Sequence, residues 1–159
     1  MALDIGEVLA YLNNYFVYTY APNVYVDFDA ATQTITLADI EKTFDDYALD
    51  VRVDQYIRTV GSRLNDGVYK VTAVETNAVT VDATLIDEES DQDLDHVTIY
   101  ELAVPQKLLS LVTEMIAWSG TNNIKSERLG PHAVTYAEPV TVFSSFKSRI
   151  KRWKKVGWQ

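Results

Sequence analysis

The stretch YIRTVGSRLNDGVYKVTAVETNAVTV, residues 56–81, decides the fold class of this chain. Three short runs within it are rich in β-branched and aromatic residues and alternate with polar ones, as half-buried strands do. The runs are residues 56–60, 68–74 and 78–81. Asp66 and Gly67 supply turn chemistry before the second run, and residues 75–77 supply it before the third. The stretch therefore predicts successive antiparallel hairpins.

Further runs of the same kind lie on both sides of this stretch. They are residues 17–20, 24–28, 34–37, 51–54 and 97–102. The first two are separated by Ala21, Pro22 and Asn23, which predict a turn. Five or more short strands at this spacing predict a small antiparallel sheet or barrel over residues 24–102.

Outside that region the apolar residues follow a helical period. Residues 3–16, 104–119 and 143–153 each place apolar side chains three or four positions apart, which predicts three amphipathic helices. Pro105 suits the first turn of the second helix, and Gly120 suits its end. A glycine- and proline-containing stretch then predicts an irregular connection to the third helix.

These segments predict an α+β protein with two parts. Residues 1–23 and 103–159 form a small helical domain, and residues 24–102 form an antiparallel β-sheet or barrel module inserted into it. At 159 residues the chain can bury a core without covalent cross-links.

Charge is divided unevenly along the chain. Residues 1–106 contain 20 acidic and 5 basic side chains, whereas residues 107–159 contain 3 acidic and 9 basic ones, and the formal net charge is −9. Such a protomer is an electric dipole, whose basic end attracts an acidic partner.

Catalysis and cofactor binding find little support in the residue types present. The chain has no cysteine, which excludes disulfides, thiol nucleophiles and cysteine-based metal sites. Its two histidines, His96 and His132, do not share a metal-binding spacing. Gly67 lacks the lysine that a phosphate-binding loop requires after its glycine. We therefore expect a non-enzymatic protein without a cofactor.

An acidic run at residues 87–95 has some likeness to a calcium-binding loop. Asp91, Asp93 and Asp95 alternate as the first ligands of that motif do. His96 stands where the motif needs glycine, and Leu102 stands where it needs a bidentate glutamate. A solvated acidic loop explains the run better, so no metal site is expected.

The sequence also gives an expectation about location. It lacks an N-terminal signal pattern and an apolar stretch long enough to cross a membrane, which predicts a soluble protein that is not exported by a cleaved signal. Ten tyrosines and three tryptophans leave two interpretations open, a tyrosine-rich β core or an aromatic protein interface.

The basic C-terminal segment is the candidate contact site. Its residues are Lys147, Arg149, Lys151, Arg152, Trp153, Lys154, Lys155 and Trp158. Cations interleaved with tryptophan suit nucleic acid, a membrane surface or an acidic protein surface. The overall negative charge opposes a phosphate backbone, so an acidic protein surface is favoured. We also expect residues after Ile150 to contribute little to the monomer core.

Three segments resemble a known family. Residues 124–130 with residues 133–136, Ile-Lys-Ser-Glu-Arg-Leu-Gly and Ala-Val-Thr-Tyr, look like the family's segment after its long helix. Residues 108–119 resemble its core helix, and residues 55–69 are similar to a β module inserted in some members. The family is that of the head-tail connector proteins of long-tailed bacteriophages, also called head-completion or adaptor proteins.

The resemblance implies a virion structural protein that forms a ring, usually of twelve copies, at the head-tail interface. It implies a portal protein above, a tail-side connector or tail terminator protein below, DNA passing through the lumen without specific binding, no membrane contact, and assembly in the host cytoplasm. In that family the C-terminal segment commonly reaches toward the portal. A tail-completion or tail-terminator ring protein is the alternative class, and a nucleic-acid-binding module is another.

A second candidate site is the segment after the second helix, which we interpret as an inter-subunit loop. A glycine-proline step, an acidic-basic pair and a terminal tyrosine have the composition of an ordered interface. The residues assigned to it are Ser126, Glu127, Arg128, Gly130 and Tyr136.

Overall fold

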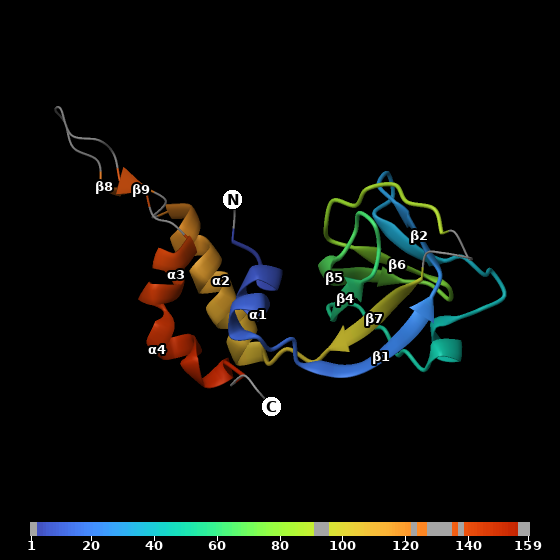
Figure 1. Cartoon of the computed structure of the whole chain (residues 1–159), viewed down its shortest axis with the longest axis horizontal. Coiled ribbons are helices and arrows are strands. Elements are labelled where there is room, and N and C mark those ends of the chain that lie inside the picture. The colour runs from blue at the N-terminus through green and yellow to red at the C-terminus, as the bar shows by residue number, and fades with distance from the viewer. Residues whose placement is uncertain (1–2, 91–95, 122–123, 127–134, 137–138, 156–159) are drawn as a thin grey trace. The chain divides into compact units, whose positions relative to one another are not determined.

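In the computed structural model the chain folds into a helical unit, Met1–Tyr15 with Val104–Gln159, and a β module, Phe16–Ala103 (Figure 1). The structure describes residues 3–90, 96–121, 124–126, 135–136 and 139–155. Helices and an antiparallel sheet make the chain an α+β protein, as the sequence predicts.

The β module begins earlier than residue 24. Val17–Val24 is a single strand, β1, rather than part of the helical domain. The turn expected at residues 21–23 is a bulge within β1, where Asn23 has a φ of 58°. A bulge accommodates the extra residues and leaves both ends of the strand paired with the same neighbour.

Seven strands form one antiparallel sheet in the order β1-β7-β4-β5-β6-β3-β2. After β1 the strands are β2 (Val26–Asp29), β3 (Thr34–Leu37), β4 (Tyr56–Val60), β5 (Gly67–Val74), β6 (Ala78–Val81) and β7 (Val97–Leu102). Hairpins join β4 to β5 and β5 to β6, as the turn chemistry predicts, and a further hairpin joins β2 to β3. A short 3₁₀ helix, η1 (Phe44–Tyr47), lies between β3 and β4.

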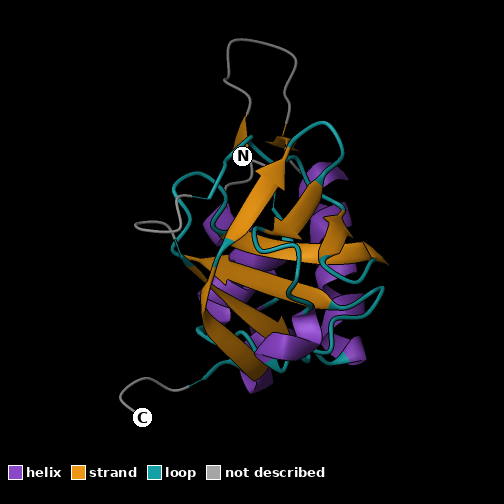
Figure 2. Cartoon of the chain, turned by 90° about the vertical axis from the view of Figure 1, so that its right-hand side faces the viewer, coloured by secondary structure: helices purple, strands orange, loops and turns teal. Residues whose placement is uncertain are grey.

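The sheet curls back on itself. Its two end strands, β1 and β2, are separated along the chain by Tyr25 alone, so the ends of the sheet meet at that residue. Figure 2 shows the strands running in clearly different directions, as expected for a strongly curled sheet. The outer side of β2 is paired by Phe28 with Glu88, which form a two-bond bridge of 2.8 and 3.0 Å.

Alternate residues of these strands fill the interior. The core cluster includes Ile57, Val71, Val81 and Ile99, all at most 1% exposed. The run at residues 51–54 does not form the expected strand, because Asp54 has a φ of 70° and turns the chain into β4.

Asn65 holds the loop between β4 and β5. Its side-chain oxygen accepts a hydrogen bond from the Ile86 N–H, and its side-chain nitrogen donates to the Ile86 carbonyl, both at 2.8 Å. The same nitrogen donates to the buried Glu88 carboxylate at 3.0 Å. The backbone carbonyl of Asn65 accepts from the Thr59 and Tyr69 hydroxyls at 2.6 Å each. Sequence patterning identified this segment only as a turn.

In its described residues the helical unit has four helices, a 3₁₀ turn and one pair of short antiparallel strands. These are α1 (Ile5–Leu12), α2 (Gln106–Thr121), β8 (Ile124–Ser126), β9 (Thr135–Tyr136), α3 (Pro139–Ser145), α4 (Lys147–Ile150) and η2 (Lys151–Trp153). Within the stretch where the sequence predicts an irregular connection, β8 pairs with β9, and the residues between these two strands lie outside the described ranges.

Buried side chains from α1, α2, α3 and α4 form the helical core. They are Val8, Leu9, Leu12, Leu108, Leu111, Val112, Met115, Val142, Phe143, Phe146 and Ile150. Asp4 and Glu7 form a capping box at the start of α1, with reciprocal bonds of 2.9 and 3.0 Å. Such a box satisfies two otherwise unpaired N–H groups.

One helix is shorter than predicted, and another starts earlier, at Pro139, and is broken into shorter pieces. The first ends at Leu12 instead of Phe16, because Asn13 adopts a left-handed φ of 50° and its N–H bonds back to the helix. The third is interrupted at Phe146, where the Arg149 N–H bonds to the Phe146 carbonyl three residues earlier. This tighter turn still directs Phe143, Phe146 and Ile150 into the core.

Candidate protein-interaction surfaces

The basic segment, defined as residues 147–155, runs along the surface of the helical unit. Phe146 and Ile150 anchor it in the core. Its six cationic side chains are exposed: Lys147, Arg149, Lys151, Arg152, Lys154 and Lys155. The sequence therefore placed the charged residues correctly on the side opposite the apolar ones.

The end of the basic segment is bound to the C-terminus of α1. The Lys155 N–H donates to the Leu12 carbonyl at 2.9 Å, and Asn14 Nδ2 donates to the Trp153 carbonyl at 3.1 Å. The Lys154 ammonium lies 4.9 Å from the centre of the Tyr11 ring. A helix C-terminus favours nearby cations and needs donors for its last carbonyls, and the basic segment supplies both.

These contacts change one expectation. Residues after Ile150 were expected to contribute little to the monomer core, yet residues 153–155 contact α1. The contacts come from backbone groups and an asparagine, which carry no hydrophobic period, so the sequence pattern could not reveal them. Trp158 lies outside the described residues.

Arg149 is held by a partner on α2. Its guanidinium lies 2.7 Å from a Glu114 carboxylate oxygen, and both side chains are about half exposed. The hydrogen bond from Arg149 lowers the pKa of Glu114 below its ordinary value. Arg149 also lies 5.4 Å from the centre of the Phe146 ring. The ion pair therefore fixes the direction in which one cation of the segment points.

The candidate inter-subunit loop is only partly described. Ser126 ends β8 and pairs with Thr135, while Ile124 pairs with Tyr136. The pairing brings the two ends of the segment together. Glu127, Arg128 and Gly130 lie outside the described residues.

The two units have opposite net charges. The helical unit contains 9 basic and 5 acidic residues, and the β module contains 5 basic and 18 acidic ones. The unit that carries the basic segment is thus cationic, and the inserted module is strongly anionic.

One acidic residue of the β module is buried. Glu101 on β7 is 1% exposed and lies on the same face of the strand as the core residues Val97 and Ile99. Burial raises the pKa of its carboxyl, which the Asp50 N–H lowers in part by hydrogen bonding. Its Oε1 has no hydrogen-bond partner among the described residues. Through the Asp50 backbone, Glu101 thus contacts the segment before β4.

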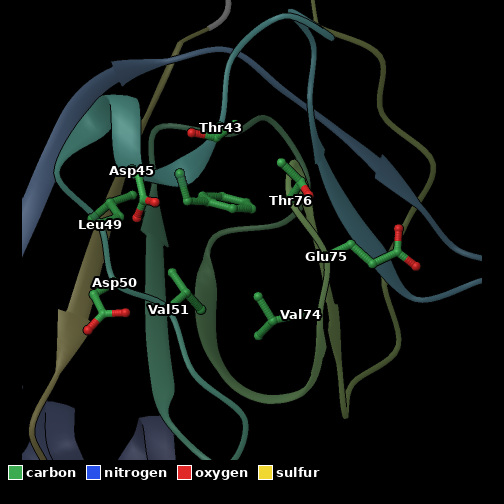
Figure 3. A pocket seen from close by; sticks show the side chains of 9 residues that line it. Thr43, Asp45, Leu49, Asp50, Val51, Val74, Glu75 and Thr76 are labelled. Atoms are coloured by element: carbon green, nitrogen blue, oxygen red, sulfur yellow. The ribbon is translucent and has the colours of Figure 1, made fainter.

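A pocket of about 340 Å³ lies on the β module beside that segment. Its lining comes from η1, the residues after it, and the turn between β5 and β6. The lining residues are Thr43, Phe44, Asp45, Leu49, Asp50, Val51, Val74, Glu75 and Thr76. In Figure 3, Asp45 and Asp50 lie on one side of the pocket and Glu75 on the other. The pocket thus combines polar and apolar side chains in similar measure, between acidic sides.

A second hollow of about 700 Å³ is lined by carboxylates that are bound to the backbone. Asp27 accepts a hydrogen bond from the Ser90 N–H at 2.6 Å, and Asp29 accepts one from the Ala31 N–H at 2.8 Å. Asp87 accepts from the Ala30 N–H at 2.8 Å. These carboxylates hold loops in place, which gives them a structural role.

The tyrosines divide between core and surface. Tyr69 is 9% exposed, and burial raises the pKa of its phenol. Tyr18 and Tyr20 on β1 are 75% and 58% exposed, and the Tyr20 ring lies 5.7 Å from that of Tyr100 on β7. The core interpretation therefore holds for Tyr69, and a protein interface at Tyr18 and Tyr20 stays a prediction.

The described residues contain no cluster of histidine, aspartate and glutamate side chains that could hold a metal ion. Within the same described ranges, no helix has the length and apolar character needed to cross a membrane. Comparisons with family models, curated proteins and solved structures found no match to this chain.

Proposed function

We propose that this protein is a non-enzymatic structural subunit of a bacteriophage virion, which assembles into a ring at the head-tail interface. The separation of charge between the two units carries the proposal. A cationic helical unit and an anionic inserted module give each copy two complementary surfaces at different places. Different surfaces that bind each other build rings when the rotation between copies closes.

The resemblance to head-tail connectors supports this class. The connector-like segment after the core helix begins in β8 and ends in β9, and the core helix corresponds to α2. The connector-like β module corresponds to β4 and β5. The proposed partners are a portal protein on one side and a tail-side connector or tail terminator on the other. The alternative, a tail-completion or tail-terminator ring, shares the same assembly principle.

Electron microscopy of the purified chain, alone and mixed with a phage portal protein, tests the proposal. We expect rings, or a ring bound to the portal. Glu127→Arg in the candidate inter-subunit loop is expected to leave the monomer folded by circular dichroism and to block rings. Lys147→Glu changes a charge on the exposed basic segment and reports whether that segment is needed for portal binding. Monomers under all conditions would reject the ring function.

Nucleic-acid binding is the second candidate, because cations and Trp153 lie together in the basic segment. Arg152 lies 4.4 Å from the centre of the Trp153 ring. If about five cations neutralised phosphates, log affinity for duplex DNA would fall against log salt with a slope of about −4. A chain with a net charge of −9 is expected to bind only weakly at physiological salt. Tight, steeply salt-dependent binding would favour this candidate over the ring subunit.

A further inference from the structure

The pocket between η1 and the β5–β6 turn places the exposed Val74 side chain among carboxylates and threonines. Phe44, Leu49 and Val51 belong to the core and are at most 8% exposed, while Val74 is 40% exposed. An apolar group that entered the pocket would therefore contact Val74 and the edges of these core residues. A volume of about 340 Å³ is near the lower end for ligand sites and suits a single large side chain.

Carboxylates around the pocket determine the charge that a ligand must carry next to its apolar group. Asp45, Asp50 and Glu75 are exposed and lie on opposite sides of the pocket (Figure 3). Asp50 already pairs with Arg52 at 2.6 Å. The carboxylates of Asp45 and Glu75 have no ion-pair partner within the described part of the chain. A ligand with positive charges next to its apolar group would neutralise them.

The C-terminus of this chain supplies such a ligand. Residues 154–159 read Lys-Lys-Val-Gly-Trp-Gln, so two cations precede a tryptophan by three and four residues. The Lys154 and Lys155 side chains are exposed on the helical unit, where the Lys155 backbone N–H bonds to Leu12 and the Lys154 ammonium lies over Tyr11. Tryptophan offers the largest apolar surface of any side chain and is enriched at binding hot spots.

We propose that this pocket binds the C-terminal residues 154–159 of a second copy of the chain, with Trp158 as the inserted side chain. The contact joins the basic end of one copy to the acidic module of the next. It uses two different surfaces, so each copy can offer a pocket and a tail at the same time. Binding between the pocket and the tail does not depend on the proposed function. Its role as the contact between ring subunits does.

Binding of a fluorescein-labelled peptide of residues 151–159 tests the pocket directly. The receptor is the full chain with Trp158→Ala, so that its own tail does not compete. Adding Val74→Arg fills the pocket with a long cationic side chain and is expected to weaken peptide binding at least tenfold. Val53→Arg is the matched control, because Val53 is also an exposed valine of the β module, at 53%, and lies outside the pocket. Equal affinity of the two variants would reject the pocket.

A mixing experiment identifies the source of the tail. The Trp158→Ala chain retains a pocket, and the Val74→Arg chain retains a tail, so an equimolar mixture can form one contact per pair. Sedimentation at high concentration should show one-to-one heterodimers in the mixture and monomers of each variant alone. A mixture that stays monomeric would overturn the proposal that the tail of one copy binds the pocket of another.

Electron microscopy then separates this inference from the ring function. Rings formed equally by wild type and Val74→Arg would show that the pocket is not the subunit contact, while the ring function stands. Absence of rings for wild type, with tenfold-selective peptide binding and heterodimers in the mixture, would reject the ring function and retain the pocket.

Discussion

The Tyr11 ring on α1 lies parallel to the Phe143 ring on α3, with the ring centres 4.0 Å apart and the planes inclined by 2°. The stack joins the first helix of the chain to a helix more than a hundred residues later. Because α1 and α3 belong to the same unit, this contact helps close the helical core around residues contributed by both ends of the chain.

Phe143→Ala should lower the free energy of unfolding of the helical unit by about 3–5 kcal/mol, since it removes a buried aromatic side chain. Tryptophan fluorescence during urea unfolding measures this unit selectively, because Trp118, Trp153 and Trp158 all lie within it. Lys147→Ala, an exposed change nearby, is the control and should leave the transition in place. A Phe143→Ala transition that coincides with wild type would contradict the packing.

Truncation tests the anchoring of the basic segment. A chain ending at Ile150 loses the Asn14 and Leu12 contacts to residues 153–155 and should be less stable by about 1–2 kcal/mol, the net value of two hydrogen bonds. A chain ending at Lys155 keeps them and should unfold like wild type. Circular dichroism during thermal unfolding distinguishes the two. Equal stability of both truncations would mean that these contacts contribute nothing.

Asn65→Ala should destabilise the β module by roughly 3 kcal/mol, because it leaves the Ile86 backbone groups and the buried Glu88 carboxylate without their partner. Asn65→Asp has the same shape but cannot donate to Glu88, and it should be at least as damaging at neutral pH. Far-ultraviolet circular dichroism in the β region is the measurement. Fluorescence excited near 280 nm is less suitable, because it also reports the tryptophans of the helical unit. A neutral effect of both changes would contradict the role of Asn65.

Glu101 should make the β module less stable as the pH rises. Burial raises the pKa of this carboxyl in the folded protein, so the folded state binds the proton more tightly than the unfolded state. The contribution is fully present below the ordinary glutamate pKa and is lost as the pH rises through the raised value. Nearby Asp50 raises the pKa further, and Arg52 opposes it.

Glu101→Gln removes this titration. Urea unfolding of wild type and variant between pH 4 and pH 8 should show a difference that shifts in favour of the variant as the pH rises. Val53→Ala, an exposed change in the same module that adds and removes no titrating group, should produce no such trend. A constant difference between wild type and Glu101→Gln would mean that Glu101 titrates normally.

Strand positions were predictable where turn chemistry and alternation coincide. The runs at 34–37, 56–60, 78–81 and 97–102 match β3, β4, β6 and β7. Helix ends were harder to predict from the sequence, because they depend on single residues with left-handed backbone geometry, such as Asn13. Alternation along β7 in fact places Glu101 on the same face as Ile99, but a charged residue at an inward position is easily taken for a solvent-facing one.

The candidate surfaces were predictable only in their charge. Counting residues located the basic segment and the acidic region, because net charge does not depend on the fold. The pocket was not predictable, since its lining combines residues 43–51 with residues 74–76. The sheet brings these segments together through the pairing of β5 with β4 and β6. Its apolar lining residues also look, in sequence, like ordinary core positions.

The pairing of Val17 with Leu102 and the 2.8 Å bond from the Ala103 N–H to the Phe16 carbonyl place the entry and exit of the β module side by side. The module is therefore a cassette in the topological sense: a short linker between α1 and α2 could replace all of it without rerouting the helices. A lineage could acquire, exchange or lose such a cassette in one recombination event. The helical unit and the acidic module can accordingly evolve at different rates and toward different partners.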